Sequence, residues 1–339
     1  MIKKIMILIL VMVFAFSSMG LLAEAKVVEV RFTAMTTTCD LYMLGVGWSN
    51  VLRKYAPDIR MTCLAKGGTT KLLRGMVNKE WEIAWIGSPH LVCAKEGILL
   101  FEKEKEYSKE KYYDPTRVLF GVLTGWCNYV VRADSDIYSI ADLKGKRVHL
   151  GMAGGFGGIM TKGAFRGEGL DIDKGDYKGI YVPTEQALDQ LRDKAGVDNA
   201  LVWGGIPQSL ITNLSCKVPL RQLSLTKEGF ERFQKDFVVG PYTVLITLSP
   251  EEIKEAYGGR VVNTTPVYTW TIPLMAVVRK ETDEELVYTL VKTLWEHLDE
   301  VKSVSKQLER LTFETALKSL SAPFHPGALR YYKEIGAIK

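Results

Sequence analysis

The chain has 339 residues, of which 47% are hydrophobic and 24% charged, proportions typical of a folded globular protein rather than a disordered one. The formal net charge of +5 is small and the basic residues are dispersed, which argues against a nucleic-acid-binding surface. The length exceeds that of one ordinary hydrophobic core, so we expect two domains.

The N-terminal residues 1–25 have the pattern of a secretory signal peptide. A basic start precedes an apolar run over residues 5–16, and Ala23 and Ala25 frame a small-residue cleavage site. The apolar run is shorter than the roughly 20 residues that a membrane-spanning helix needs. We therefore expect cleavage near Ala25 and a periplasmic mature chain, with an uncleaved N-terminal anchor as the alternative.

From residue 27 onward, β-rich apolar segments alternate with segments of helical periodicity. The expected strands are 27–34, 59–64 and 82–86, and the expected helices are 41–55, a segment up to 77, and a segment after 89. A turn rich in small or polar residues separates each strand from its helix. This alternation predicts a doubly wound α/β domain with a mainly parallel sheet.

A second α/β series follows two apolar strands within residues 118–132. Its expected strands are 147–151, 199–203 and 220–225; one long strand at 267–279 and helices at 282–298 and 304–320 complete the chain. The predicted fold class is α/β with two lobes joined by hinge strands. Residues 26–132 and 226–339 would form lobe 1, and residues 133–225 would form lobe 2.

Several motifs of enzymes and metal sites are missing from the sequence. There is no P-loop and no G-x-S-x-G nucleophile motif. The four histidines, His90, His149, His297 and His325, are not at metal-ligand spacing, and the five cysteines include no C-x-x-C. The sequence therefore nominates no catalytic residue, no metal and no cofactor, although catalytic groups can lie far apart in a sequence.

The turns that follow the strands are the expected ligand site. In open α/β sheets, ligands bind beyond the carboxyl ends of the strands. A helix that begins there presents unpaired backbone N–H groups and partial positive charge, which suit a carboxylate or a phosphate. The candidate ligand-binding residues are Thr36, Thr37, Thr38, Tyr42, Gly68, Thr69, Thr70 and Ser88 in the first series, Gly154, Gly155, Phe156, Trp203, Gly204 and Gly205 in the second, and Tyr242.

These residues also have purely structural interpretations. A threonine before a helix can cap it, and Trp203 can pack in a core. The glycine-rich turn at 151–158 matches a dinucleotide-binding loop superficially. The acidic residues Asp171 and Asp173, however, follow a helix rather than the strand that such a site requires.

Over essentially the whole mature chain, the sequence resembles the TAXI-type substrate-binding subunits of tripartite ATP-independent periplasmic (TRAP) transporters. The resemblance rests on Gly67-Gly68-Thr69, on residues 137–148, on Trp203-Gly204-Gly205-Ile206-Pro207 and on the tail at 324–336. It implies a type II periplasmic-binding-protein fold without enzyme activity. It also implies delivery of an amino acid or a small carboxylate, such as glutamate, to an ion-coupled membrane permease.

Two turns depart from the family pattern where ligand contact is expected. The segment Thr36-Thr37-Thr38-Cys39-Asp40 replaces a glycine-rich start and keeps only Tyr42 of a tyrosine pair, and Gly155-Phe156-Gly157 replaces Ser-Gly-Thr. The resemblance therefore implies the fold and a transport role, but no particular ligand. We expect a monomeric clamp; the alternatives are a ligand sensor that signals to a membrane partner and a secreted enzyme on the same scaffold.

Overall fold

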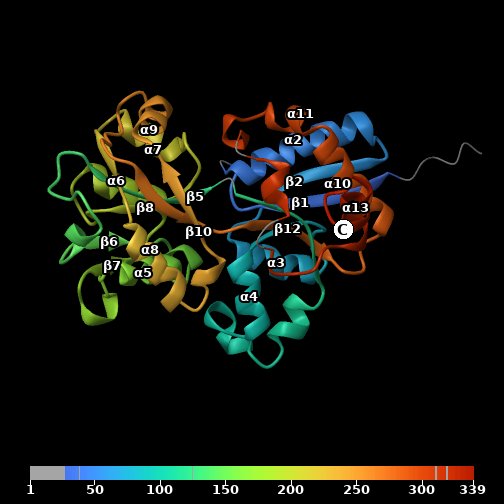
Figure 1. Ribbon diagram of the computed structural model, residues 1–339, viewed down its shortest axis with the longest axis horizontal. Helices are drawn as coiled ribbons and strands as arrows, with labels where there is room; N and C mark the ends of the chain where they lie inside the picture. Colours follow the sequence, from blue (N-terminus) through green and yellow to red (C-terminus); the bar gives the residue numbers. More distant parts are fainter. Residues whose placement is uncertain (1–26, 38, 124, 310, 318–319) are drawn as a thin grey trace, which may run out of the picture.

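The computed structural model describes residues 27–339 except residues 38, 124, 310, 318 and 319. The predicted signal peptide and Thr38 therefore lie outside the described residues. Two α/β lobes lie side by side, with β1–β4 and β12 in lobe 1 and β5–β11 in lobe 2 (Figure 1). The predicted two-lobed α/β fold is confirmed. In the described part of the chain, every helix is too short or too polar to cross a membrane.

Lobe 1 is built on a mixed sheet with the strand order β2-β1-β3-β12-β4. Its strands are β1 (Val28–Ala34), β2 (Ile59–Ala65), β3 (Ala84–Gly87), β4 (Thr116–Val122) and β12 (Leu274–Arg279). β1 and β2 are parallel, and Phe32 joins β1 to Ile83 beside β3 through a parallel bridge. β12 is antiparallel to both of its neighbours.

Helices pack around this sheet, and the first three of them begin shortly after a strand ends. They are α2 (Asp40–Tyr55), α3 (Thr69–Val77), α4 (Ser88–Glu96), α10 (Glu284–Glu296), α11 (Leu298–Lys302), α12 (Phe313–Ala316) and α13 (Pro326–Glu334). Trp48 on α2 is fully buried and packs edge-on against Phe32 and Phe120, with ring centroids 6.0 and 5.4 Å away. Its indole N–H donates to the carbonyl of Leu290, 3.0 Å away, so one side chain joins α2, the sheet and α10.

Lobe 2 repeats the strand order of lobe 1 as β7-β6-β8-β5-β9. The strands are β5 (Trp126–Arg132), β6 (Arg147–His149), β7 (Lys178–Ile180), β8 (Ala200–Gly204) and β9 (Leu220–Leu223). β6 and β7 are parallel, Val148 bridges to Asn199 beside β8, and β5 runs antiparallel between β8 and β9. The remaining elements are α5 (Phe156–Gly167), α6 (Thr184–Arg192), α7 (Ser209–Ser215), α8 (Lys227–Asp236), α9 (Pro250–Tyr257) and an antiparallel pair, β10 (Val244–Leu248) and β11 (Val267–Thr271).

Two short segments join the lobes. Residues 123–125 connect β4 to β5, and residues 272–273 connect β11 to β12. The predicted long strand at 267–279 is therefore two strands in different lobes, because Pro273 has no N–H to continue a ladder. The two crossings lie close together, since the hydroxyl of Thr271 donates a hydrogen bond to the carbonyl of Gly125.

The structure places the boundary between the lobes elsewhere than the sequence analysis did. Residues 226–271 belong with lobe 2, not lobe 1: α8 packs against α5, and the N–H of Thr226 donates to Glu168 Oε1, 2.8 Å away. β5 also belongs to lobe 2, so the first crossing precedes residue 126. The sequence pattern assigned no elements to residues 226–266, and which sheet an element joins depends on contacts between distant segments.

One predicted helix is wrong. Within residues 304–320 the structure has a 3-10 turn at Lys306–Leu308 and the short helix α12. Thr312 between them has extended backbone dihedrals, φ −130° and ψ 150°, which are incompatible with a continuous helix. Leu308 and Leu311 are buried, as the periodicity suggested, but they lie in a 3-10 turn and a loop rather than in a continuous helix.

Candidate ligand-binding cleft

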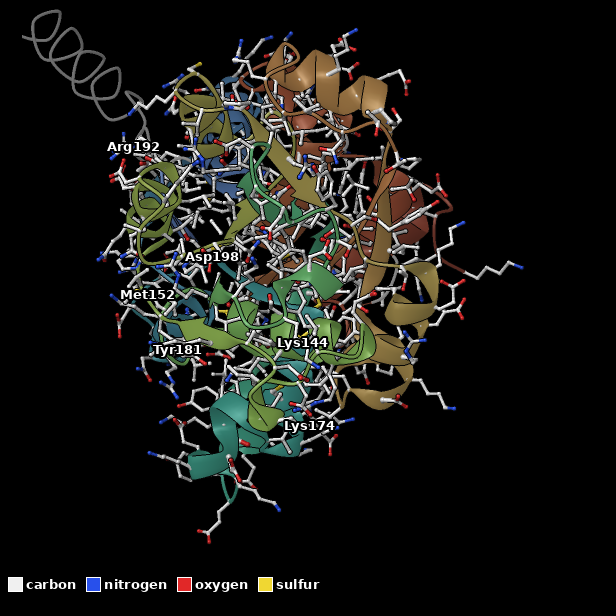
Figure 2. All side chains as sticks on the ribbon, turned by 90° about the vertical axis from the view of Figure 1, so that its left-hand side faces the viewer. Lys144, Met152, Lys174, Tyr181, Arg192 and Asp198 are labelled. Atoms are coloured by element: carbon white, nitrogen blue, oxygen red, sulfur yellow. The ribbon has the colours of Figure 1, made fainter. Side chains whose placement is uncertain are left out.

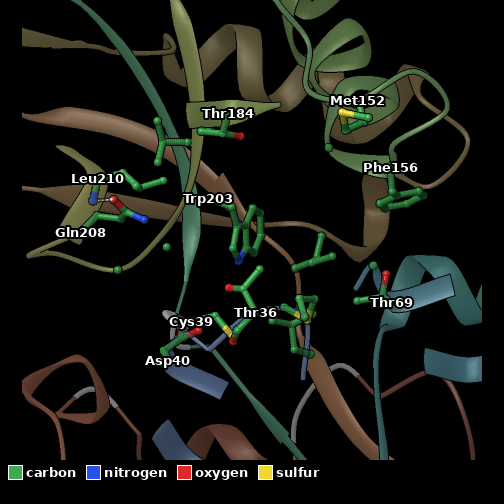
Figure 3. Close-up of a pocket in the computed structure, with 18 of the residues that line it drawn as sticks. Thr36, Cys39, Asp40, Thr69, Met152, Phe156, Thr184, Trp203, Gln208 and Leu210 are labelled. Carbon is green, nitrogen blue, oxygen red and sulfur yellow. Dashed lines mark hydrogen bonds between the residues drawn. The ribbon is translucent and has the colours of Figure 1, made fainter. Parts of the chain in front are cut away.

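A cavity of about 490 Å³ lies between the lobes, a size that suits a small organic molecule (Figure 3). From lobe 1 and the crossing segment it is lined by Met35, Thr36, Cys39, Asp40, Gly68, Thr69, His90, Ile272 and Leu274. From lobe 2 it is lined by Met152, Phe156, Gly157, Pro183, Thr184, Glu185, Val202, Trp203, Gly204, Gly205, Gln208, Leu210 and Trp270. Both lobes therefore contribute walls to one site.

Two helices on opposite lobes begin at this cavity. α3 starts after Gly68 and α5 starts after Gly155, and no side chain caps either helix. Gly154, just before α5, has φ +72°, a conformation that favours glycine. Their first-turn N–H groups and the positive ends of their dipoles are therefore available to a ligand group that accepts hydrogen bonds.

The candidates from the sequence divide into two groups. Those that line the cavity are Thr36, Gly68, Thr69, Phe156, Trp203, Gly204 and Gly205. Those that lie outside the lining are Thr37, Tyr42, Thr70, Ser88, Gly154, Gly155 and Tyr242, while Thr38 lies outside the described residues. The structure thus brings these turns to one cavity, but not every side chain in a turn lines it.

The structure explains why three of these candidate residues do not line the cavity. Ser88 is fully buried, and its hydroxyl lies 3.4 Å from Met275 Sδ in lobe 1. Tyr42 on α2 packs against the lobe 1 core. Tyr242 lies in a 3-10 turn between α8 and β10, and it lines a separate depression together with Lys95 and Ser321.

The candidates from the sequence did not include the polar lining residues Cys39, Asp40, His90, Thr184, Glu185 and Gln208. Gln208 caps α7, with Oε1 accepting from the N–H groups of Leu210 (2.7 Å) and Ile211 (3.1 Å). Thr184 is the first residue of α6, directly after Pro183. His90 follows the turn Gly87-Ser88-Pro89 that the analysis had singled out, so extending that turn by one residue would have found it.

The buried side-chain amide of Asn128 fixes the backbone on either side of Trp203 through hydrogen bonds. Asn128 Nδ2 donates to the carbonyls of Val202 (3.1 Å) and Gly204 (2.9 Å), and Gln222 donates to Asn128 Oδ1 from 2.9 Å. Gly204 has φ +144°, so a side chain there would strain the backbone. Trp203 packs beside Trp270, with centroids 5.7 Å apart, and projects into the middle of the cavity (Figure 3).

The electrostatics of the cavity are unusual for an anion site. Among the residues that the structure describes, no lysine or arginine lines the cavity; the ionisable lining residues are Cys39, Asp40, Glu185 and His90. Burial lowers the pKa of His90 to about 3, so the imidazole is neutral at pH 7. A bound anion would therefore depend on backbone N–H groups and hydroxyls, with apolar walls such as Trp270 and Leu274 around its carbon skeleton.

The mouth of the cavity lies near the outer face of lobe 2. Met152 lines the cavity but is 59% exposed, and Figure 2 shows it on the same face as Tyr181. Among the residues that the structure describes, no group of three or more His, Cys, Asp or Glu side chains is arranged to hold a metal ion.

Comparison with known protein families agrees with this architecture. The NMT1-like family matches residues 32–336, nearly all of the described chain. The chain belongs to the NMT1-like family. This is a family of periplasmic solute-binding proteins, and a two-lobed fold with an interlobe cavity is the structure that such binding requires.

The NMT1-like chain also resembles several solved structures at low identity. The binding protein component of an ABC phosphonate transporter from Pseudomonas aeruginosa is 14% identical, with 84% of this chain and 80% of that chain covered and a TM-score of 0.47. The periplasmic aliphatic sulphonate binding protein from Escherichia coli is 12% identical, with 91% and 78% covered and a TM-score of 0.46. A TRAP periplasmic solute binding protein from Desulfovibrio salexigens is 10% identical, with 92% and 82% covered and a TM-score of 0.46.

Proposed function

We propose that this chain is the extracytoplasmic receptor of a TRAP-type transporter and that it captures a small organic anion, an amino acid or a carboxylate, by closing its lobes. One observation carries the proposal: the uncapped starts of α3 and α5 lie on opposite lobes and face one largely apolar cavity. The anionic group would accept hydrogen bonds from these helix starts. The apolar part would lie against Trp203 and its neighbours.

The placement of the two helix starts supplies a reason for closure. A ligand can make hydrogen bonds to both lobes only when they are close together, so it binds the closed form more tightly than the open form. The closed form is then the one that a membrane permease would recognise. The TRAP type of that permease rests on the resemblance at residues 137–148 and 324–336.

The cavity chemistry narrows the class of anion. Since the described part of the lining holds no lysine or arginine, a second carboxylate, as in glutamate, would find no cationic partner there, and Asp40 and Glu185 would repel it. A ligand with one anionic group and an apolar body fits best. An ammonium group, as in an apolar amino acid, would meet favourable charge at those two carboxylates.

A ligand screen with variants of Gly68 tests the proposal. The mature protein is tested by thermal shift and calorimetry against amino acids, monocarboxylates, dicarboxylates, sulfonates and neutral compounds. A ligand at 100 times its Kd adds about 2.7 kcal/mol to stability. We expect stabilisation by monoanions or apolar amino acids; stabilisation by neutral compounds alone would overturn the anionic assignment, and no binding at all would overturn the receptor assignment.

The substitution Gly68→Asp places a carboxylate at the start of α3. Gly68 has φ −64° and ψ 154°, and a Cβ there would meet nothing within 4 Å, so any side chain fits. Aspartate is a good helix cap and should preserve or raise the melting temperature, but it would occupy the N–H groups and repel the ligand. We expect at least about tenfold weaker anion binding. Gly68→Ala adds no side-chain oxygen that could cap α3, so this variant should bind the anion as tightly as the wild type.

A further inference from the structure

His90 and Phe156 form a direct aromatic contact between the lobes. His90 is on α4 of lobe 1, and Phe156 begins α5 of lobe 2. Their ring centroids are 3.7 Å apart with the planes inclined by 34°, and the residues are only 4% and 8% exposed. Phe156 lies above Thr69 in Figure 3, on the far side of the cavity from Gln208. A contact this short exists only while the lobes are together.

The hydrogen bonds of His90 fit a neutral ring and not a cation. Nε2 lies 2.9 Å from the hydroxyl of Thr69. Nδ1 is buried and has no hydrogen-bond partner among the described residues. A Cβ on Gly87 would lie 2.6 Å from Nδ1, so this nitrogen packs directly against the backbone of Gly87. An imidazolium carries two N–H donors, and the one on Nδ1 would be left without an acceptor.

No neighbouring charge compensates for protonation. The charged side chains on α3, α4 and α5 and in the cavity beside His90 are Lys71, Arg74, Lys95, Glu96, Lys162, Arg166, Asp40 and Glu185. Two short helical segments, Leu99–Glu104 and Lys109–Tyr113, pack against α4 and add Glu102, Lys103, Glu104, Lys109, Glu110 and Lys111. Burial alone lowers the pKa of His90 to about 3, without a contribution from any of them. Arg74 is paired with Glu104, and Arg166 is paired with Asp171.

We propose that His90 and Phe156 form an interlobe latch that opens when His90 takes up a proton, so that the clamp favours closure at neutral pH and releases its solute in acid. The proton binds readily only in the open form, where water reaches the ring. Because the latch is built from the two lobes themselves, it operates in the ligand-free protein. The inference therefore goes beyond the proposed function and does not depend on the identity of the solute or the transporter.

The direction of the pH effect follows from the two protonation states. An exposed histidine has a pKa near 6.5, and closure lowers that of His90. The stabilisation of the closed form is thus complete above pH 6.5 and is lost as the pH falls toward 3. Between pH 7.5 and 4.5, the ratio of closed to open molecules should fall by about 100-fold.

The test measures the distance between the lobes in the ligand-free mature protein. Fluorescent amino acids replace Tyr107 in lobe 1 and Tyr138 in lobe 2, which are 46% and 67% exposed. Energy transfer is recorded at pH 7.5 and 4.5, with far-UV circular dichroism to verify that both lobes stay folded. We expect the distance to increase on acidification. An unchanged distance, or lobes already open at pH 7.5, would overturn the latch.

Three variants separate the latch from general acid effects. His90→Phe keeps a ring against Phe156 but cannot be protonated, so it should stay closed at both pH values; opening like the wild type would overturn the proposal. Phe156→Leu removes the ring from the other lobe and should be more open at pH 7.5, which tests the contact even if His90→Phe folds poorly. His297→Gln, which alters a histidine stacked on Tyr55 away from the cleft, should behave as the wild type.

Discussion

The hydroxyl of Thr271 donates a hydrogen bond to the backbone carbonyl of Gly125, and so links the two segments that cross between the lobes. Both residues are buried. A second hydroxyl, that of Thr269, makes the same kind of bond to the carbonyl of Cys127 two residues further into lobe 2. The pair therefore offers a comparison between a bond at the crossing and a similar bond inside one lobe.

Replacing Thr271 by valine should loosen the crossing. The substitution keeps the shape of the side chain and leaves the Gly125 carbonyl without this donor, at a cost of about 1–3 kcal/mol in the free energy of unfolding. Thr269→Val should cost a similar amount. Only Thr271→Val should broaden the distribution of interlobe distances measured by energy transfer, and equal broadening in both variants would contradict a special role for the crossing.

Removal of the Trp203 ring should weaken solute binding. The ring projects into the cavity and packs beside Trp270, so Trp203→Ala leaves part of the ligand without an apolar wall. We expect at least about tenfold weaker binding by calorimetry, for any solute found in the screen. Tyr138→Ala, which removes a largely exposed ring elsewhere on lobe 2, is the control and should leave the Kd unchanged.

The two glycines that follow Phe156 should respond differently to alanine. A Cβ on Gly158 would lie 2.2 Å from the carbonyl oxygen of Leu150, so α5 would have to move away from the end of β6. We expect Gly158→Ala to cost about 1–3 kcal/mol in urea unfolding. Gly157→Ala meets only Leu201 at 3.7 Å and should be neutral or slightly stabilising, because alanine favours the helix.

His149 should make the stability of lobe 2 depend on pH. Nε2 lies 3.0 Å from the carbonyl of Val182, and Nδ1 accepts from the N–H of Leu201 at 3.2 Å, an arrangement that requires a neutral ring. Burial lowers the pKa of His149, although the bond to Val182 acts in the opposite direction. Its contribution to stability is therefore present above pH 6.5 and is lost as the pH falls through the pKa of the folded form.

Urea unfolding at pH 7.5 and 5.0 measures this effect. The wild type should lose stability on acidification, with a contribution from His149 of at most about 1.4 kcal/mol per pH unit. His149→Gln should be less stable at pH 7.5 but should show a weaker pH dependence. An identical pH dependence in the variant would show that other groups account for the acid sensitivity.

Much of the fold followed from local pattern. The alternation of strand, turn and helix predicted the elements from β1 to α4 within a few residues, because burial on one face of a strand or helix leaves a regular sequence period. The turns at Gly68 and Phe156 were located for the same reason, since a ligand site at strand ends follows from the α/β alternation itself. The first crossing between the lobes was expected after residue 132, but the structure has it before β5, at residues 123–125.

Other features depended on contacts that no local pattern records. The assignment of residues 226–271 to lobe 2 is decided by packing of α8 on α5, between segments far apart in the chain. The contact of His90 with Phe156 forms only when both lobes are in place, and so does a cavity whose described lining has no lysine or arginine. The sequence by itself determined which elements form and where their turns lie, because these are set by neighbouring residues. Only the tertiary structure decided which turns meet and with what charge, because that depends on long-range packing.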